Sequence, residues 1–256
     1  MPSDNSTSHS LTLANVSKTY PSGLDALAPI NFSLYPGEFV SLVGPSGCGK
    51  STMLRLVAGL TEPTRGKAYL GSGTTKIGFV FQDPTLMPWA TVSENIQLPL
   101  KLSNMLEPGL REHVATVLDW VGLTDFRDVY PRELSGGMKM RASIARALII
   151  QPDLLLLDEP FAALDEFTRA QLNEDLLHLW QQEKWTSIFV THSIREAVFL
   201  SNRILVMSPR PGRIIADVPV RFDHPRDPGL RNSHAYNDLC ADIASRLAVH
   251  MNGEER

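Results

Sequence analysis

The chain has 256 residues, of which 43% are hydrophobic, and a formal net charge of −4. This length supports a full core in one domain, or in one domain with an appended lobe, and the mixed charge gives no electrostatic footprint for nucleic acid. Two cysteines cannot build the disulfide framework of a secreted protein, and no apolar run approaches the roughly 20 residues that cross a bilayer. We therefore expect a soluble protein of a reducing cytosol, which reaches a membrane only through a partner.

Apolar patterning predicts the elements of an α/β protein. After a polar tail, alternating or continuous apolar runs predict strands over residues 11–16, 31–34, 39–43, 68–70, 77–81, 154–157, 187–190 and 204–207, the last two completing the set. Helical spacing predicts a helical region over 91–121, interrupted at Pro99 and at 108–109, and helices over 135–150, 166–183, 194–200 and 230–249. The strands before residue 39 are expected to be antiparallel.

A glycine-rich stretch follows the strand at 39–43 and precedes a helix that begins near Lys50. Its glycines let the backbone curl so that successive N–H groups point toward phosphate oxygens at the positive end of that helix. Lys50 is placed to reach the β- and γ-phosphates, and the Ser51 hydroxyl is a hard oxygen ligand for Mg²⁺. The stretch predicts a nucleotide site formed by Gly44, Pro45, Ser46, Gly47, Cys48, Gly49, Lys50, Ser51 and Thr52.

Two carboxylates end the leucine run 154–157, at the edge where a parallel sheet binds ligands. Asp158 is expected to hold the Mg²⁺ shell, and Glu159 to polarise the water that attacks the γ-phosphate in line. An isolated pair of this kind could be two solvated acids. Lys50 and Ser51 upstream favour the catalytic interpretation.

Ser135, Gly136 and Gly137 open a predicted helix, which leaves N–H groups and a positive dipole end available to an anion. With the phosphate loop, this segment resembles the signature segment of the ATP-binding cassette (ABC) ATPases. The resemblance implies a P-loop NTPase core with an antiparallel β subdomain and an α-helical signature subdomain. It also implies that the signature of one copy closes over the γ-phosphate held by a second copy, so that a head-to-tail dimer encloses two ATP.

Four further positions match this family. Tyr20 resembles the aromatic residue that stacks on adenine, and Gln82 resembles the glutamine that touches Mg²⁺, the attacking water and the permease contact. His192 resembles the switch histidine that contacts the γ-phosphate, and residues 163–165 resemble the loop that faces the opposite subunit. The apolar cluster Leu86, Met87, Pro88 and Trp89 follows Gln82, and it either folds back onto the helical insertion or docks a permease.

More narrowly, residues 79–89, 158–165 and 207–213 resemble the nitrate/sulfonate/taurine-type importer ATPases. The implied ligands are ATP and Mg²⁺. The implied partners are a second copy of the chain, two transmembrane permease subunits and, indirectly, an extracytoplasmic solute-binding protein, at the cytoplasmic face of the inner (plasma) membrane. We expect a disordered tail over 1–10, the ABC ATPase domain over 11–220 with its helical insertion at about 90–150, and a C-terminal helical extension over 221–256.

Alternatives stay open at this level. A non-transport ABC ATPase acting on nucleic acid or ribosomes would share the site, but repair members insert a long coiled coil where only residues 53–133 intervene here, and translation-factor members carry two cassettes. A P-loop kinase would not need Ser135 or His192. The extension could bind a regulator or pack as a helix. The solute is open among nitrate, taurine, alkanesulfonates, aromatic sulfonates and vitamin precursors such as pyrimidines, because the ATPase never touches it.

Overall fold

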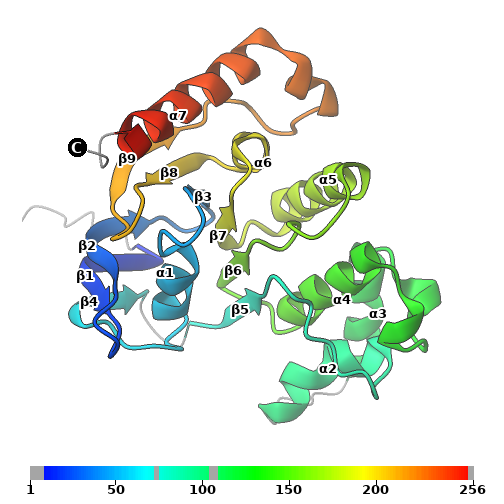
Figure 1. Cartoon of the computed structure of the whole chain (residues 1–256). Helices are drawn as coiled ribbons and strands as arrows, with labels where there is room; N and C mark the ends of the chain where they lie inside the picture. Colours follow the sequence, from blue (N-terminus) through cyan, green and yellow to red (C-terminus); the bar gives the residue numbers. More distant parts are fainter. Residues whose placement is uncertain (1–8, 72–74, 104–108, 253–256) are drawn as a thin grey trace, which may run out of the picture. The chain divides into compact units, whose positions relative to one another are not determined.

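The structure is a computed structural model that describes residues 9–71, 75–103 and 109–252, in two compact units. The first unit contains residues 1–75 and 184–256, and the second contains residues 76–183. The elements of each unit carry their labels in Figure 1. Of the tail predicted over residues 1–10, the first eight residues lie outside the described part of the chain.

An antiparallel sheet begins the first unit. Strand β1 (Leu11–Thr19) lies between β2 (Asp25–Leu34) and β4 (Arg65–Leu70) and pairs antiparallel with both. Leu11 and Leu13 of β1 are buried and Thr12 between them is partly exposed, which is the alternation expected of a sheet with one covered face. The antiparallel strands predicted from this alternation are confirmed.

A second group of strands in the first unit runs in the order β7 (Thr186–Thr191), β3 (Phe39–Val43), β8 (Arg203–Met207) and β9 (Ile214–Pro219). β3 is parallel to both β7 and β8, and all five of its residues are buried. Strands buried on both faces read as continuous apolar runs, which is why the sequence locates all three. The short helices α1 (Lys50–Val57) and α6 (Ile194–Leu200) follow β3 and β7.

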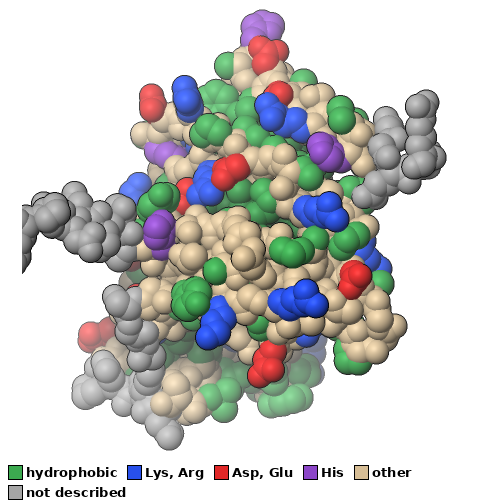
Figure 2. All heavy atoms as spheres, turned by 90° about the vertical axis from the view of Figure 1, so that its left-hand side faces the viewer, with side chains coloured by type: hydrophobic (Ala, Val, Ile, Leu, Met, Phe, Trp, Pro, Cys, Tyr) green, Lys and Arg blue, Asp and Glu red, His purple; other side chains and the backbone are tan. Residues whose placement is uncertain are grey.

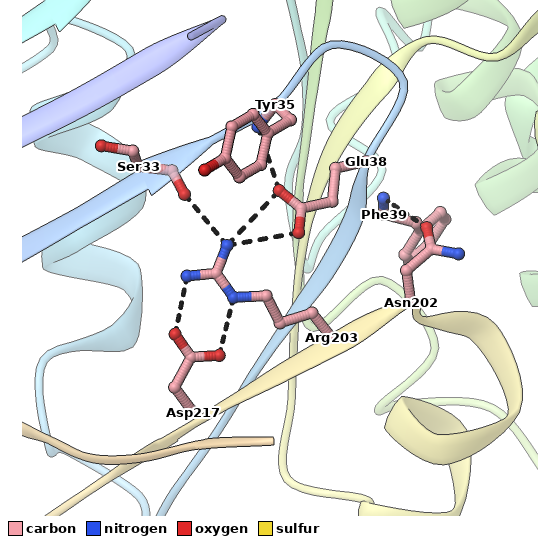
Figure 3. A network of polar contacts seen from close by, with 7 residues as sticks. All are labelled: Ser33, Tyr35, Glu38, Phe39, Asn202, Arg203 and Asp217. Carbon is pink, nitrogen blue, oxygen red and sulfur yellow. Dashed lines mark hydrogen bonds and ion pairs between the residues drawn. The ribbon is translucent and has the colours of Figure 1, made fainter. Parts of the chain in front are cut away.

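Strand β9 was not predicted, and the expectation that 204–207 completes the strands was wrong. β9 pairs antiparallel with β8 at the edge, and Val218 is its only buried residue. Its apolar stretch, residues 214–216, is short and ends at Asp217. The Arg203 side chain holds this edge: its Nε and a terminal nitrogen donate to Asp217 of β9 at 2.6 and 2.7 Å (Figure 3). It also donates to the Ser33 carbonyl at 3.1 Å and to Glu38. These carboxylates raise the pKa of Arg203.

The C-terminal segment packs onto α6. It comprises the 3₁₀ turn η3 (Pro228–Asn232) and α7 (His234–Asn252). The fully buried Tyr236 donates through its hydroxyl to the Arg195 carbonyl at 2.6 Å. The buried Arg226 guanidinium donates to the carbonyls of Val198, Phe199 and Ser201 at 3.1, 2.6 and 2.8 Å, and so caps the C-terminal end of α6.

His224, which precedes η3 in the chain, makes the free energy of unfolding depend on pH. Burial, then the positive charges of Arg226 and Lys184, lower the pKa of His224 from 6.5 to about 4, against the opposing charge of Asp223. Between these two values the unfolded chain binds a proton that the folded chain does not, so the free energy of unfolding falls as the pH drops. We expect wild type to lose on the order of 1–2 kcal/mol from this group between pH 7.5 and 4.5, less than the full shift because the ring is half-buried.

Urea unfolding of wild type and His224→Gln at both pH values isolates this contribution, since all other titrating groups are shared. The variant should lose less stability than wild type over the same interval. Equal losses would show that the pKa of His224 is the same in the folded and unfolded states.

The second unit combines a strand pair with helices. β5 (Ile77–Val80) and β6 (Leu154–Asp158) pair in parallel, and β6 is completely buried. The helices and 3₁₀ turns of this unit are α2 (Val92–Leu102), α3 (Leu110–Trp120), η1 (Thr124–Phe126), η2 (Pro131–Glu133), α4 (Gly136–Leu148) and α5 (Glu166–Glu183). The helix predicted over 135–150 and the N-cap at Ser135 are confirmed, since α4 is present and the Ser135 hydroxyl accepts from the Met138 N–H at 3.3 Å. Within the described residues, no helix is long and apolar enough to cross a membrane.

Helix α2 continues through Pro99, where the sequence predicted an interruption. Proline removes its own N–H from the helical ladder and its ring crowds the carbonyl four residues earlier, but the Pro99 carbonyl still accepts from the Ser103 N–H at 3.1 Å. The helix starts with a capping box between Thr91 and Glu94, and it buries Ile96 and Leu100. Capping and packing of the apolar face therefore outweigh the lost hydrogen bond and the steric cost of the proline ring.

Candidate nucleotide-binding and coupling site

The phosphate loop joins the end of β3 to α1 in the first unit. Gly47 and Gly49 have φ values of 74° and 105°, which side chains other than glycine rarely adopt. The Cys48 N–H donates to the Pro45 carbonyl at 3.3 Å and closes a turn at the tip of the loop. The Lys50 ammonium, whose residue is only 4% exposed, donates to the carbonyls of Gly44 and Pro45 at 2.9 and 3.0 Å.

The glycines of the loop also allow close packing that the sequence did not reveal. A Cβ on Gly49 would lie 2.6 Å from a methyl carbon of Leu27 and 2.8 Å from the Ala26 carbonyl oxygen, both in β2. A Cβ on Gly44 would lie 2.9 Å from the Met207 carbonyl oxygen at the end of β8. The loop is thus seated against two strands. A curled backbone that opens a helix, with a lysine folded over it, fits a phosphate group.

Tyr20 and His192 lie in the same unit as the phosphate loop. The Tyr20 hydroxyl lies 3.2 Å from the Thr52 hydroxyl in α1, and the Lys18 ammonium lies 5.3 Å from the centre of the Tyr20 ring. Val43 pairs with Thr191 in the parallel ladder of β3 and β7, so Gly44 and His192 each leave the sheet at the same edge. His192 itself is exposed, and Ser193 after it caps α6 by accepting from the Glu196 N–H.

Gln82, Asp158 and Glu159 lie together in the second unit. Val80 pairs with Leu157 in the parallel ladder of β5 and β6, which brings Gln82 and the two carboxylates to one edge. Asp158 is 8% exposed, whereas Gln82 is exposed. Glu159 has a φ of 47°, an uncommon conformation for a residue with a side chain, at a cost on the order of 1–3 kcal/mol. Strain of this kind is typical of residues whose position serves function.

The signature residues and residues 163–165 also lie in the second unit. Ser135 and Gly136 are exposed at the start of α4, and the first intrahelical bond runs from the Lys139 N–H to the Ser135 carbonyl at 2.9 Å. The N–H groups ahead of Lys139 belong to the helix terminus, where an anion can bind. Asp165 accepts from the Thr168 N–H at 3.0 Å, and this hydrogen bond lowers the pKa of Asp165.

Two residues that shape the segment after Gln82 escaped the sequence analysis. The fully buried Asn95 side chain accepts from the Met87 N–H at 2.7 Å and donates to the carbonyls of Met87 and Ala90 at 3.1 and 3.0 Å. Arg146 of α4 donates to the carbonyls of Pro84 and Thr85 at 2.7 and 2.8 Å. The sequence provides little signal for Asn95, because polar residues such as Glu94 and Gln97 surround it in the predicted helix.

Trp89 lies on the segment that these two residues hold, and it is 74% exposed. Leu86 and Met87 are partly exposed and Pro88 is exposed. Of the two expectations for this apolar cluster, the structure of the second unit excludes burial of Trp89 in that unit's core. A loop held by hydrogen bonds therefore presents an aromatic side chain at the surface.

Comparison with known proteins places these features in context. The family model described as ABC transporter matches residues 27–162. The "Aliphatic sulfonates import ATP-binding protein SsuB" of Bacillus anthracis is 47% identical over 229 residues, which cover 88% of this chain and 89% of that protein. An "Uncharacterized ABC transporter ATP-binding protein" of Methanocaldococcus jannaschii is 48% identical over 208 residues, covering 79% and 78% of the two chains.

Among solved structures, a dimeric, post-hydrolysis form of the ATP-binding cassette MJ0796 bound to ADP and Pi matches with a TM-score of 0.73 and 34% identity, covering 83% of this chain and 100% of that one. A structure of cbiO1 from Clostridium perfringens matches with a TM-score of 0.76 and 26% identity, covering 97% and 100%. These matches confirm the predicted α/β fold.

Proposed function

Because the chain belongs to the ABC transporter family of ATPases, we propose that it is the ATP-hydrolysing subunit of a bacterial importer for solutes of the nitrate/sulfonate/taurine class. ATP binding and hydrolysis are the activity of the family. The observation that carries the importer assignment is the 47% identity, over 88% of the chain, to a protein named for aliphatic sulfonate import. The nucleic-acid alternative has no support from these relatives, and on the face drawn in Figure 2 positive and negative side chains are interspersed.

The site residues are assigned roles by their chemistry. The N–H groups of the phosphate loop and Lys50 bind the phosphates, and Tyr20 contacts adenine. Ser51, Asp158 and Gln82 supply oxygen ligands of the kind that Mg²⁺ prefers. Glu159 activates the attacking water, and His192 contacts the γ-phosphate. When bound, Mg²⁺ would neutralise charge that develops on the phosphates.

The assembly that follows contains two copies of this chain and two permease subunits. In it, Ser135, Gly136 and Gly137 of one copy complete the phosphate site of the other. We place the chain at the cytoplasmic face of the plasma membrane, held there by the permease, with an extracytoplasmic solute-binding protein acting through that permease.

Reconstitution tests the importer assignment. The chain is purified with its permease subunits, placed in liposomes with the solute-binding protein, and supplied with ATP. We expect ATP-dependent uptake of taurine, an alkanesulfonate or nitrate. ATP hydrolysis that responds to ribosomes or nucleic acid, with no uptake of any of these solutes, would overturn the assignment.

The exposed Trp89 provides a separate prediction for the permease contact. Trp89→Ala should abolish transport and stimulation of ATP hydrolysis by the permease, while the free energy of unfolding stays within about 0.5 kcal/mol of wild type because the side chain is 74% exposed. Trp180→Ala in the same unit is the matched control. Trp180 is buried, so its truncation should cost about 3–5 kcal/mol. Normal permease stimulation in Trp89→Ala would remove Trp89 from the contact.

A further inference from the structure

The segment 208–213 follows β8, and no role is assigned to it above. Within it, Ser208 and Arg213 close a tight loop: the Ser208 N–H donates to the Arg213 carbonyl at 2.9 Å, and the Arg213 N–H donates to the Ser208 hydroxyl at 3.1 Å. The loop joins β8 to β9, and both strands belong to the first unit. Its shape is therefore set by its own hydrogen bonds.

This loop is seated between β2 and the phosphate loop. The Gly212 N–H donates to the Ala26 carbonyl and the Gly212 carbonyl accepts from the Ala28 N–H, both at 3.1 Å. A Cβ on Gly212 would lie 2.0 Å from the Cys48 carbonyl oxygen, closer than any real side chain could lie. Only glycine permits this approach, so the loop meets the phosphate loop backbone to backbone.

Arg210 makes the polar contact between the two loops. Its Nε and a terminal nitrogen donate to the Gly47 carbonyl oxygen at 3.0 and 2.9 Å. Hydrogen bonds from a charged donor are stronger than neutral ones. Gly47 is exposed and holds a φ of 74°. The guanidinium thus holds the tip of the phosphate loop from outside.

The peptide that Arg210 contacts is the one that closes the turn. The Gly47 carbonyl and the Cys48 N–H belong to one planar peptide group, so holding the oxygen fixes the direction of the N–H. That N–H donates to the Pro45 carbonyl, and Gly49 and Lys50 follow directly. Fixing this plane orients the N–H groups that follow it for a phosphate before any ligand binds. The loop then loses less conformational entropy on binding.

We propose that Arg210 is a positioning residue that preorganises the phosphate loop for the phosphates of ATP and ADP. The inference rests on the proposed nucleotide site. It predicts that Arg210→Ala weakens MgADP binding, and raises the KM for ATP, by about 5–10-fold, the loss expected for an exposed charge-assisted contact in which two N–H groups share one carbonyl oxygen. The kcat should stay within about 2-fold, because Arg210 contacts no group assigned to hydrolysis.

The test compares four full-length variants by MgADP calorimetry, by steady-state ATPase kinetics and by thermal unfolding. Arg213→Ala is the matched control: the residue lies in the same loop, its side chain is exposed, and its backbone bonds survive truncation. It should bind MgADP as wild type does. Arg210→Lys keeps one charged donor and should recover part of the affinity that Arg210→Ala loses. Lys50→Ala should lower the affinity for MgADP more than either Arg210 variant does.

The outcomes separate the two proposals. If Lys50→Ala binds MgADP as wild type does, the nucleotide site itself is wrong. If Lys50→Ala fails to bind but Arg210→Ala matches Arg213→Ala, only the role of Arg210 is wrong. If both Arg210 variants have a lower melting temperature and a lower kcat but an unchanged KM, Arg210 only stabilises the fold. That result would overturn the positioning role.

Discussion

Glu159→Gln is expected to lower the rate of ATP hydrolysis by about 100- to 1,000-fold while leaving ATP binding intact, the size of effect typical of losing a general base. The glutamine side chain has the same shape, so the backbone at φ 47° and the neighbouring Asp158 should keep their places. With hydrolysis blocked, the ATP-bound dimer should accumulate. Single-turnover hydrolysis measures the chemical step, and gel filtration with ATP measures the dimer.

Glu183→Gln is the matched control for this result. It makes the same change in the same unit, at an exposed residue that ends α5, and it should hydrolyse ATP at the wild-type rate. Near-normal hydrolysis by Glu159→Gln would mean that another group activates the water.

Mixing two inactive variants should restore hydrolysis if the signature residues act on the second copy. Lys50→Ala removes the phosphate-binding ammonium, and Gly136→Asp places a negative charge where the γ-phosphate is expected. Gly136 suits this purpose better than Gly137, since a Cβ on Gly137 would lie 2.7 Å from a methyl carbon of Thr168, whereas one on Gly136 lies at an ordinary 3.4 Å from Leu164. The Gly136 variant should therefore keep its fold.

In a mixed dimer, one site combines an intact Lys50 with an intact signature, and the other site carries both defects. Random pairing of equal amounts makes half of the dimers mixed, so up to about a quarter of the wild-type sites become complete. Each variant alone should be inactive. A self-contained site predicts no recovery at any mixing ratio, and it also predicts a rate strictly proportional to protein concentration.

The local sequence determined those elements of the protein that depend on residues close together in the chain. The glycine-rich loop after a buried strand, the cap at Ser135, and the helices at 166–183 and 194–200 follow from turn residues and apolar spacing within a few positions. Strands buried on both faces, such as β3 and β6, were found because they must be continuously apolar. Order and spacing of the motifs then indicated the ABC ATPase family, and the family model confirms it.

Tertiary structure decided the features that no run of apolar residues or turn residues in the sequence indicates. Edge strand β9 has only a short apolar stretch and depends on pairing with β8 and on Arg203. Helix α2 continues through Pro99 because its N-terminal cap and its buried face compensate for the cost of a proline inside the helix. Asn95 is polar yet buried, because loop carbonyls satisfy it. Arg210 reaches Gly47 across 163 positions, since two loops meet at one edge of the first unit. No local pattern encodes such a contact, because its cause is the fold itself.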